Sequence, residues 1–446
     1  MSNIVLMPHQ EEGADWIAST DGDNLVDGDT GVGKSYLGIA AADRTGAKNI
    51  LVICPAVARI NWGREVAVCQ TMDRNITVIE KQKDIQDDLE GFVIVSYDLA
   101  VRLAEQLSRF DWDFLFLDEV QFLKNKDAKR TRAVFGYRNV PGIAASAERI
   151  LALSATPAPN HIGELWPWLH AIGYVTEDHS RFLRRHCRLQ EPPWGIKVTG
   201  NKREAVAALM QRVSPSIMRI RKADVLKDLP PVRFSSLEVP GDRTAEHVRS
   251  LEGDYREEIN QLIQSIQSKA LPPSDHLTTL RRLTEMAKVG DCIALLSQEL
   301  SDRAIKKVVV FATYRDTIKA LGEGLSRFGV EILHGGIPAG RRQEAIDNFQ
   351  SGDARVFVGQ TVAASTAITL HANGACQDVV FVSADWVPSN NTQAVGRVHR
   401  KGQPGAVMAR FLHLSNSIDE AVTRALSHKA RMLGEIFGDR GDHHAA

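Results

Sequence analysis

Two blocks of short apolar runs, alternating with stretches of helical spacing, predict an α/β fold with two lobes, each built on a parallel sheet. The runs are apolar throughout, which is typical of strands buried on both faces. Polar residues follow the runs, where open α/β sheets bind ligands. Because a stretch from about residue 173 interrupts this pattern, we expect an N-terminal lobe over 1–172, a basic helical insertion over 173–300 and a C-terminal lobe over 301–446.

Length and composition predict a water-soluble protein. The 446 residues are 43% hydrophobic and 24% charged, as in ordinary globular proteins. No apolar run is long enough to cross a membrane, and the N-terminus lacks the features of a signal peptide, so we expect a cytoplasmic, nucleoid or nucleoplasmic protein that is not secreted. The five cysteines contain no C-x-x-C pair and indicate neither disulfides nor zinc. With a net charge of −1, a polyanion would have to be bound by local basic patches.

The expected strands are read from the apolar runs. In the first lobe they lie at 24–26, 50–54, 92–96, 114–117 and 150–153. In the second lobe they lie at 307–312, 330–333, 355–359 and 379–382. The second lobe has no phosphate-binding pattern of its own, so we expect a single nucleotide, held by the first lobe.

Residues 26–35 fit the phosphate-loop pattern G-x-x-x-x-G-K-[ST], between an apolar run and a helical stretch. Glycines there let backbone N–H groups surround phosphates, and the helix N-terminus adds positive potential. The lysine reaches the β and γ phosphates, and the serine hydroxyl can ligate Mg²⁺. The alternative is a glycine-rich turn before an ordinary helix. We expect nucleotide to be bound by Gly28, Asp29, Thr30, Gly31, Val32, Gly33, Lys34 and Ser35.

Two adjacent carboxylates, Asp118 and Glu119, follow the apolar run at 114–117. Like charges repel and partial burial disfavours ionisation, so such a pair is costly unless it serves a cation. Beside a phosphate loop, we expect Asp118 to hold Mg²⁺ and Glu119 to orient and deprotonate the attacking water. The alternative is an exposed acidic start of a loop.

The order of motifs resembles one family, the Swi/Snf-type ATP-dependent DNA translocases of helicase superfamily two, nearest its short annealing-helicase branch. Leu6–Ile17 resembles the entry motif, in which Gln10 would read adenine, and Asp118–Asn125 resembles the D-E-x-H stretch followed by K-N. Leu153–Pro157 is similar to motif three, and Met218–Pro231 to the marker between the two motor lobes. The resemblance implies two RecA-like lobes of a P-loop NTPase that use ATP and Mg²⁺.

Residues 393–403, Q-A-V-G-R-V-H-R-K-G-Q, resemble motif six of the same family. Arg397 and Arg400 are three apart, so we expect them to share a helix face and to point both guanidinium groups at one γ-phosphate held by the other lobe. Gln393 and Gly396 are expected to contact nucleotide. An exposed basic helix is the alternative.

Basic residues are concentrated between Arg181 and Lys222, where eleven Lys or Arg accompany Glu191 and Glu204. A solvated basic face is the usual interpretation of such a run, but beside a motor we favour phosphate contact. Apolar residues at helical spacing on both sides of Pro272-Pro273 predict a helical hairpin. The residues expected to contact nucleic acid are Lys124, Asn125, His334, Gly335, Gly336, Arg181, Arg184, Arg185 and Arg188. Contacts with backbone phosphates imply no sequence preference.

The chain also departs from the family pattern. Gln121 stands where the family usually has His, residues 28–30 replace Asp-Glu-Met, and Ala155 replaces Gly. Ser365 and Ala367 stand where two glycines are usual, which bears on how closely the backbone there approaches a ligand.

These patterns predict a monomeric motor that hydrolyses Mg·ATP between two lobes and moves along duplex or branched DNA without sequence preference. The catalytic residues would be Lys34, Asp118, Glu119, Arg397 and Arg400. The alternatives are a strand-separating DNA or RNA helicase, and a subunit whose ATPase switches its grip on nucleic acid. Protein partners are not indicated by the sequence.

Overall fold

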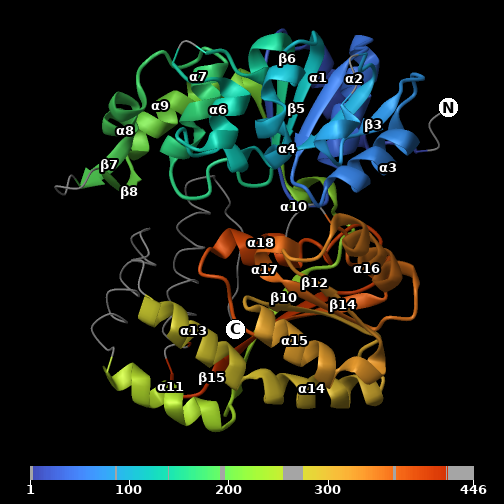
Figure 1. Cartoon of the computed structure of the whole chain (residues 1–446), viewed down its shortest axis with the longest axis vertical. Coiled ribbons are helices and arrows are strands. Elements are labelled where there is room, and N and C mark those ends of the chain that lie inside the picture. The colour runs from blue at the N-terminus through green and yellow to red at the C-terminus, as the bar shows by residue number, and fades with distance from the viewer. Residues whose placement is uncertain are drawn as a thin grey trace. The chain divides into compact units, whose positions relative to one another are not determined.

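The computed structural model describes residues 4–85, 88–138, 140–190, 196–254, 275–364, 368–417 and 419. The chain forms two compact units, Met1–Lys227 and Asp228–Ala446 (Figure 1). Each unit contains its own sheet in which all strands are parallel, so the predicted α/β class with two parallel-sheet lobes is confirmed.

The first unit is built on a seven-stranded sheet of order β3-β4-β2-β5-β6-β1-β9. The strands are β1 (Asn24–Gly28), β2 (Ile50–Cys54), β3 (Ile76–Val78), β4 (Phe92–Ser96), β5 (Trp112–Asp118), β6 (Ala147–Ser154) and β9 (Ile217–Ile220). A separate antiparallel pair consists of β7 (Cys187–Gln190) and β8 (Lys197–Asn201). Every residue of β1, β2 and β4 is buried, as the unbroken apolar runs predict.

The helices of the first unit connect these strands. They are α1 (Pro8–Ser19), α2 (Lys34–Thr45), α3 (Arg59–Cys69), α4 (Tyr97–Arg102), α5 (Ala104–Leu107), α6 (Lys129–Phe135), α7 (Trp166–Ala171), α8 (His179–His186), α9 (Arg203–Val213) and α10 (Lys222–Val225). Helices α1 and α2 pack closely because α1 has glycine at its contact: a Cβ on Gly13 would lie 2.2 Å from Leu37 Cδ1. This packing brings the start of α1 to the loop that precedes α2.

The second unit contains a six-stranded sheet of order β10-β15-β14-β11-β13-β12. Its strands are β10 (Val232–Val239), β11 (Lys307–Ala312), β12 (Val330–Leu333), β13 (Val356–Gln360), β14 (Cys376–Phe381) and β15 (Val407–Leu414). Its helices are α11 (Arg243–Asp254), α13 (Asp275–Ala287), α14 (Val289–Ser301), α15 (Arg315–Gly324), α16 (Ala339–Ser351), α17 (Thr361–Ala364) and α18 (Pro388–Val395). Alternate residues of β11 join different cores, Val309 and Phe311 on one face and Val308 and Val310 on the other. Both faces of this sheet are therefore covered.

The structure divides the chain differently from the expected three parts. Within the stretch 173–300, β9 pairs with β1 of the first sheet, whereas β10 pairs with β15 of the second. Helix α14 belongs to the core of the second unit, since Cys292, Leu296 and Leu300 are fully buried there. The first helix of the expected hairpin falls largely outside the described residues.

No helix among the described residues is long and apolar enough to span a bilayer.

Candidate active site

The phosphate-loop pattern lies between β1 and α2, in the predicted order of strand, loop and helix. Gly31 and Gly33 have φ of +84° and +82°, a left-handed conformation that favours glycine. Lys34 Nζ donates hydrogen bonds to Gly28 O over 2.6 Å and to Asp29 O over 3.1 Å, so its side chain lies across its own loop. The loop and the first turn of α2 thus place backbone N–H groups, an ammonium group and the Ser35 hydroxyl together, the donor set that a polyphosphate requires.

Helix α1 holds this loop through two buried side chains. Gln10 Nε2 donates to Val32 O over 3.1 Å, while Gln10 Oε1 accepts the Met7 N–H over 2.9 Å. His9 Nε2 lies 2.9 Å from the same Val32 oxygen. A Cβ on Gly33 would lie 2.0 Å from Gln10 Nε2, so glycine is required for this contact. His9 was not predicted as part of the site, because its role depends on the packing of α1 against the loop.

Asp118 ends β5, where it is half-buried beside the buried Glu119. Burial, and next the charge of Glu119, raise the pKa of Asp118 to about 7, although the Trp62 N–H and the charge of Lys34 act in the opposite direction. Trp62 Nε1 donates to Asp118 Oδ2 over 2.9 Å, and the Tyr97 hydroxyl donates to Asp118 O over the same distance. Trp62 and Tyr97 therefore orient Asp118, which the local sequence did not indicate.

The Asp118 environment suits a divalent cation. A buried carboxyl with a raised pKa is ionised more readily when a cation is bound beside it. No cluster of three His, Cys, Asp or Glu side chains that could hold a metal was found in the described part of the chain. Mg²⁺ needs no such cluster, since proteins commonly bind it with one or two oxygen ligands together with substrate phosphates. Ser35 and Asp118 match that donor set.

Glu119 is held by a chain of hydrogen bonds that leads to β6. Its backbone has φ of 55°, an unusual value for a residue other than glycine. Gln121 Nε2 donates to Glu119 Oε2 over 2.7 Å, and Gln121 Oε1 accepts the Ser154 hydroxyl over 2.6 Å. Ser154 Oγ in turn accepts the Thr156 N–H over 2.9 Å. Gln121, in the place of the usual His, thus connects the predicted base to the Ser-Ala-Thr stretch.

The four arginines predicted to contact nucleic acid are all exposed. Arg181, Arg184 and Arg185 lie on α8 and Arg188 on β7, while Phe182, Leu183, His186 and Cys187 between them are buried. Arg181 Nε lies 3.3 Å from Asp178 Oδ2, and Arg185 Nη1 lies 3.4 Å from Glu177 Oε1. These exposed ion pairs contribute little and leave the guanidinium groups accessible.

Lys124 and Asn125 have partners within the protein. Lys124 Nζ lies 3.1 Å from Glu164 Oε1, and Asn125 Oδ1 accepts the Asp127 N–H over 3.0 Å. Burial of Glu164 opposes its ionisation, but Lys124 and Asn160 together lower its pKa. A nucleic-acid phosphate that binds Lys124 must therefore compete with the Glu164 carboxylate for its ammonium group.

The segment 124–127 lies near the start of α8. Burial and the charge of Lys126 lower the pKa of His179, the first residue of that helix, so Lys126 is close to it. Lys124 and Asn125 were predicted separately from the arginines of α8, and both groups thus belong to one region of the first unit.

In the second unit, the predicted helix face for Arg397 and Arg400 is wrong. Helix α18 ends at Val395 with Gly396 as its C-cap, so both arginines follow the helix in turns. Arg400 Nη1 donates to Thr369 Oγ1 over 2.6 Å and Arg400 Nη2 to Ile368 O over 3.0 Å. Arg397 and Gln393 are buried, and Arg397 O accepts the Leu370 N–H over 2.8 Å. The structure therefore holds Arg400 by its guanidinium group against residues 368 and 369, and Arg397 by its backbone carbonyl against Leu370.

His334, Gly335 and Gly336 follow β12. Gln360 Oε1 accepts the Gly335 N–H over 3.2 Å, and Arg342 Nη2 donates to Gly335 O over 2.8 Å. Partial burial and the charges of Arg315 and Arg342 lower the pKa of His334. The two exposed glycines thus lie in a positively charged region. The departures at Ser365 and Ala367 fall outside the described residues.

Comparisons with known proteins agree with the order of these features. Residues 9–287 match the SNF2-related domain, and residues 291–402 match the helicase conserved C-terminal domain.

Two curated relatives match nearly the whole chain. One, from Caenorhabditis elegans, is named SWI/SNF-related matrix-associated actin-dependent regulator of chromatin subfamily A-like protein 1 homolog; it is 27% identical over 97% of this chain and 62% of its own length. The other, the DNA annealing helicase and endonuclease ZRANB3 of Bos taurus, is 25% identical over 98% of this chain and 41% of its own length. The chain therefore spans less than two thirds of either relative.

Among solved structures, the Sulfolobus solfataricus SWI2/SNF2 ATPase core in complex with dsDNA is 20% identical, with a TM-score of 0.46, over 98% of this chain and 94% of that one.

Proposed function

Since the chain belongs to the SNF2-related family, we propose that it is an ATP-dependent motor that moves along double-stranded DNA and so remodels or anneals DNA structures or displaces bound protein. The observation that supports this most is the first sheet, where the phosphate loop after β1 and the Asp118-Glu119 pair at the end of β5 lie at the same edge. Lys34 is close enough to Asp118 for its charge to lower the pKa of that carboxyl.

In this proposal, the first unit binds and hydrolyses ATP. The loop N–H groups and Lys34 hold the phosphates, and Ser35 and Asp118 would hold Mg²⁺, which neutralises phosphate charge when bound. Glu119 accepts the proton of the attacking water, and Gln121 keeps its carboxylate in place. Arg397 and Arg400 of the second unit would stabilise the charge that develops on the γ-phosphoryl group.

DNA would be held through its phosphates. In the first unit, the exposed arginines of α8 and β7 and the nearby segment 124–127 supply the cations, and in the second unit the glycines 335 and 336 beside Arg315 and Arg342 supply another site. Phosphate contacts position a protein without reading sequence, so binding should be independent of sequence.

The test is ATP turnover with duplex, single-stranded and forked DNA and with RNA. We expect duplex DNA to stimulate turnover at least as well as single strands, and stimulation to rise with duplex length, since a motor then takes more steps before reaching the end. In a triplex-displacement assay, ATP should drive removal of the third strand with little unwinding of a blunt duplex. Stimulation by RNA, or by single strands alone, would instead favour a strand-separating helicase.

Detecting movement along DNA also distinguishes the motor from the second alternative, an ATPase that only changes how tightly it binds nucleic acid. DNA-stimulated turnover that is independent of duplex length and without triplex displacement would favour that alternative.

The DNA surface can be tested by salt dependence. Reversing the charges of Arg181, Arg184, Arg185 and Arg188 should weaken DNA binding and flatten the fall of affinity with salt, because fewer counterions are released. Arg109→Glu is a suitable control, since Arg109 is 68% exposed and precedes β5, at the opposite edge of the sheet from Asp118. An unchanged salt slope in the fourfold variant would exclude this surface.

A further inference from the structure

Residues 221–231, here called the connector, join the two sheets. Strand β9 ends at Ile220 in the first sheet, and β10 begins at Val232 in the second. The connector contains α10 and ends in Pro230-Pro231, whose rings fix φ and stiffen the chain. One end is bonded to the strand and loop expected to bind nucleotide, and the other end to the segment that carries Arg397 and Arg400.

The first end is attached to Asp27, in the strand that leads into the phosphate loop. The Asp27 side chain is only 4% exposed. Arg221 Nη2 donates to Asp27 Oδ2 over 3.0 Å and Arg221 Nη1 to Asp27 Oδ1 over 3.2 Å, a two-pronged contact, while Arg219 Nε donates to Oδ2 over 3.0 Å. A buried ion pair that loses one partner leaves a charge without compensation, so this attachment resists separation.

The loop itself is attached through Asp29. Asp29 N donates to Ile220 O over 3.0 Å, and Asp29 Oδ2 accepts the Lys222 N–H over 2.8 Å. Asp29 O also accepts a hydrogen bond from Lys34 Nζ. One loop residue therefore contacts both the connector and the lysine that is expected to bind phosphate.

The other end is attached to the segment that carries the two arginines. His399, between Arg397 and Arg400, places its Nε2 2.7 Å from Pro230 O. A carbonyl oxygen only accepts, so Nε2 carries the proton in this bond. Val407 N donates to Pro231 O over 3.1 Å and fixes the end of the connector to β15.

We propose that the connector is a strap that couples the phosphate loop to the arginine segment, with Asp27 and His399 as the positioning residues at its two ends. Nucleotide that reshapes the loop at Asp29 alters the bonds to Ile220 and Lys222, and the connector carries the change to Pro230 and His399. Because coupling is reciprocal, DNA bound by the second unit then changes nucleotide affinity through the same strap. This proposal rests on the proposed function.

Hydrogen exchange tests the strap without requiring DNA movement. In the unaltered protein, Mg·ATPγS should slow exchange of the amides in residues 221–229, by about fivefold or more. Asp27→Asn and His399→Ala should each remove that response while nucleotide still binds. The proposal would be overturned if Mg·ATPγS did not slow amide exchange in the connector of the unaltered protein. It would also be overturned if exchange slowed in both variants as much as in the unaltered protein.

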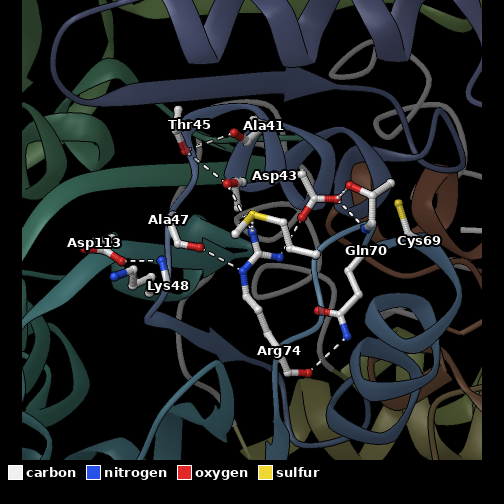
Figure 2. Close-up of polar contacts among 12 residues, drawn as sticks. Ala41, Asp43, Thr45, Ala47, Lys48, Cys69, Gln70, Arg74 and Asp113 are labelled. Carbon is white, nitrogen blue, oxygen red and sulfur yellow. Dashed lines mark hydrogen bonds and ion pairs between the residues drawn. The ribbon is translucent and has the colours of Figure 1, made fainter. Parts of the chain in front are cut away.

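Matched controls separate coupling from loss of a buried contact. Asp43 and Arg74 form an ion pair of 2.6 Å with side chains 8% and 4% exposed, and Arg74 also donates to Ala47 O over 2.7 Å (Figure 2). This pair lies at the end of α2 distant from Lys34, so Asp43→Asn makes the same chemical change in the same unit without touching the connector. Glu299→Gln, which breaks the 2.6 Å pair with Arg410, is the control in the second unit. Both controls should keep the exchange response.

Turnover provides a second measurement, as the ratio of DNA-stimulated to basal kcat, which does not depend on the folded fraction. This ratio should fall by about fivefold or more in Asp27→Asn and in His399→Ala but remain in both controls. Since one strap needs both ends, the double variant should be no worse than either single variant. A multiplicative loss in the double variant would mean two independent structural effects and would overturn the proposal. If the unaltered protein showed no DNA stimulation, the proposed motor function would fail, and hydrogen exchange would still decide on the strap.

Discussion

Removing the Gln121 amide tests how the base is held. Gln121 Nε2 donates to Glu119 Oε2 over 2.7 Å, and its Oε1 accepts the Ser154 hydroxyl, so the side chain holds the base from outside the phosphate loop. Gln121→Ala should therefore lower kcat with little change in the KM for ATP, because the base remains but its carboxylate is no longer fixed.

The size of the effect follows from that one bond. A hydrogen bond to a charged group contributes about 1.5 to 3 kcal/mol, which corresponds to a loss of about 10- to 150-fold in kcat. Glu119→Gln removes the base itself and should cost on the order of a hundredfold to ten-thousandfold while Mg·ATP still binds. Single-turnover hydrolysis and nucleotide titration measure the two quantities separately.

Two companion variants make this result decisive. Gln121→His restores a ring N–H donor at the position where the family usually has one, so it should keep most of the activity. In the Glu119→Gln background, Gln121→Ala should have no further effect on hydrolysis, because the effect of Gln121 on the chemical step is exerted through the Glu119 carboxylate. A kcat within twofold of the unaltered value in Gln121→Ala, or independent losses in the double variant, would refute the role given to Gln121.

Three further outcomes are expected. Lys34→Ala should weaken nucleotide binding, measured by titration with a fluorescent ATP analogue, since it removes a phosphate contact; unchanged affinity would exclude that contact. Arg400→Ala should lower turnover by on the order of a thousandfold with little loss of ATP affinity, and equal losses would make Arg400 a ground-state contact. The pKa of Asp118, raised to about 7, is above its unfolded value, so ionising this carboxyl opposes folding as pH rises from about 4 to 7. Mg·ATP, which favours the ionised form, should therefore raise Tm more at pH 8 than at pH 6, and an equal gain at both would contradict this assignment.

The strands that the sequence predicted are those with a local signal. Continuous apolar runs identified the buried strands β1, β2, β4, β5 and β6, whereas the half-buried β3 was missed. Strands β9, β10 and β15 were also missed, since their place depends on partners far along the chain. For the same reason, a region that appeared to be an insertion is divided between two sheets.

The residues of the candidate site were likewise predictable only where the sequence carries a local signal. A fixed spacing of glycines and lysine, and two carboxylates after an apolar run, were sufficient to predict the loop, Asp118 and Glu119. Trp62, Tyr97 and Asp27 have no such signal, because each acts through a residue distant in sequence. The helix predicted for Arg397 and Arg400 failed because Gly396 ends α18 before them.

The pairing of β9 with β1 also has a consequence for synthesis of the chain. Residues 217–220 form the edge strand of the first sheet and pair with β1, so the strand that leads into the phosphate loop stays at an open edge until the ribosome has released residue 220. Open edges of apolar strands invite pairing with other chains. The second sheet closes later still, because β10 must wait for residues 407–414 of β15. Each unit thus pairs a strand with one synthesised much later, and the nascent protein relies on the later segment to protect the earlier strand from aggregation.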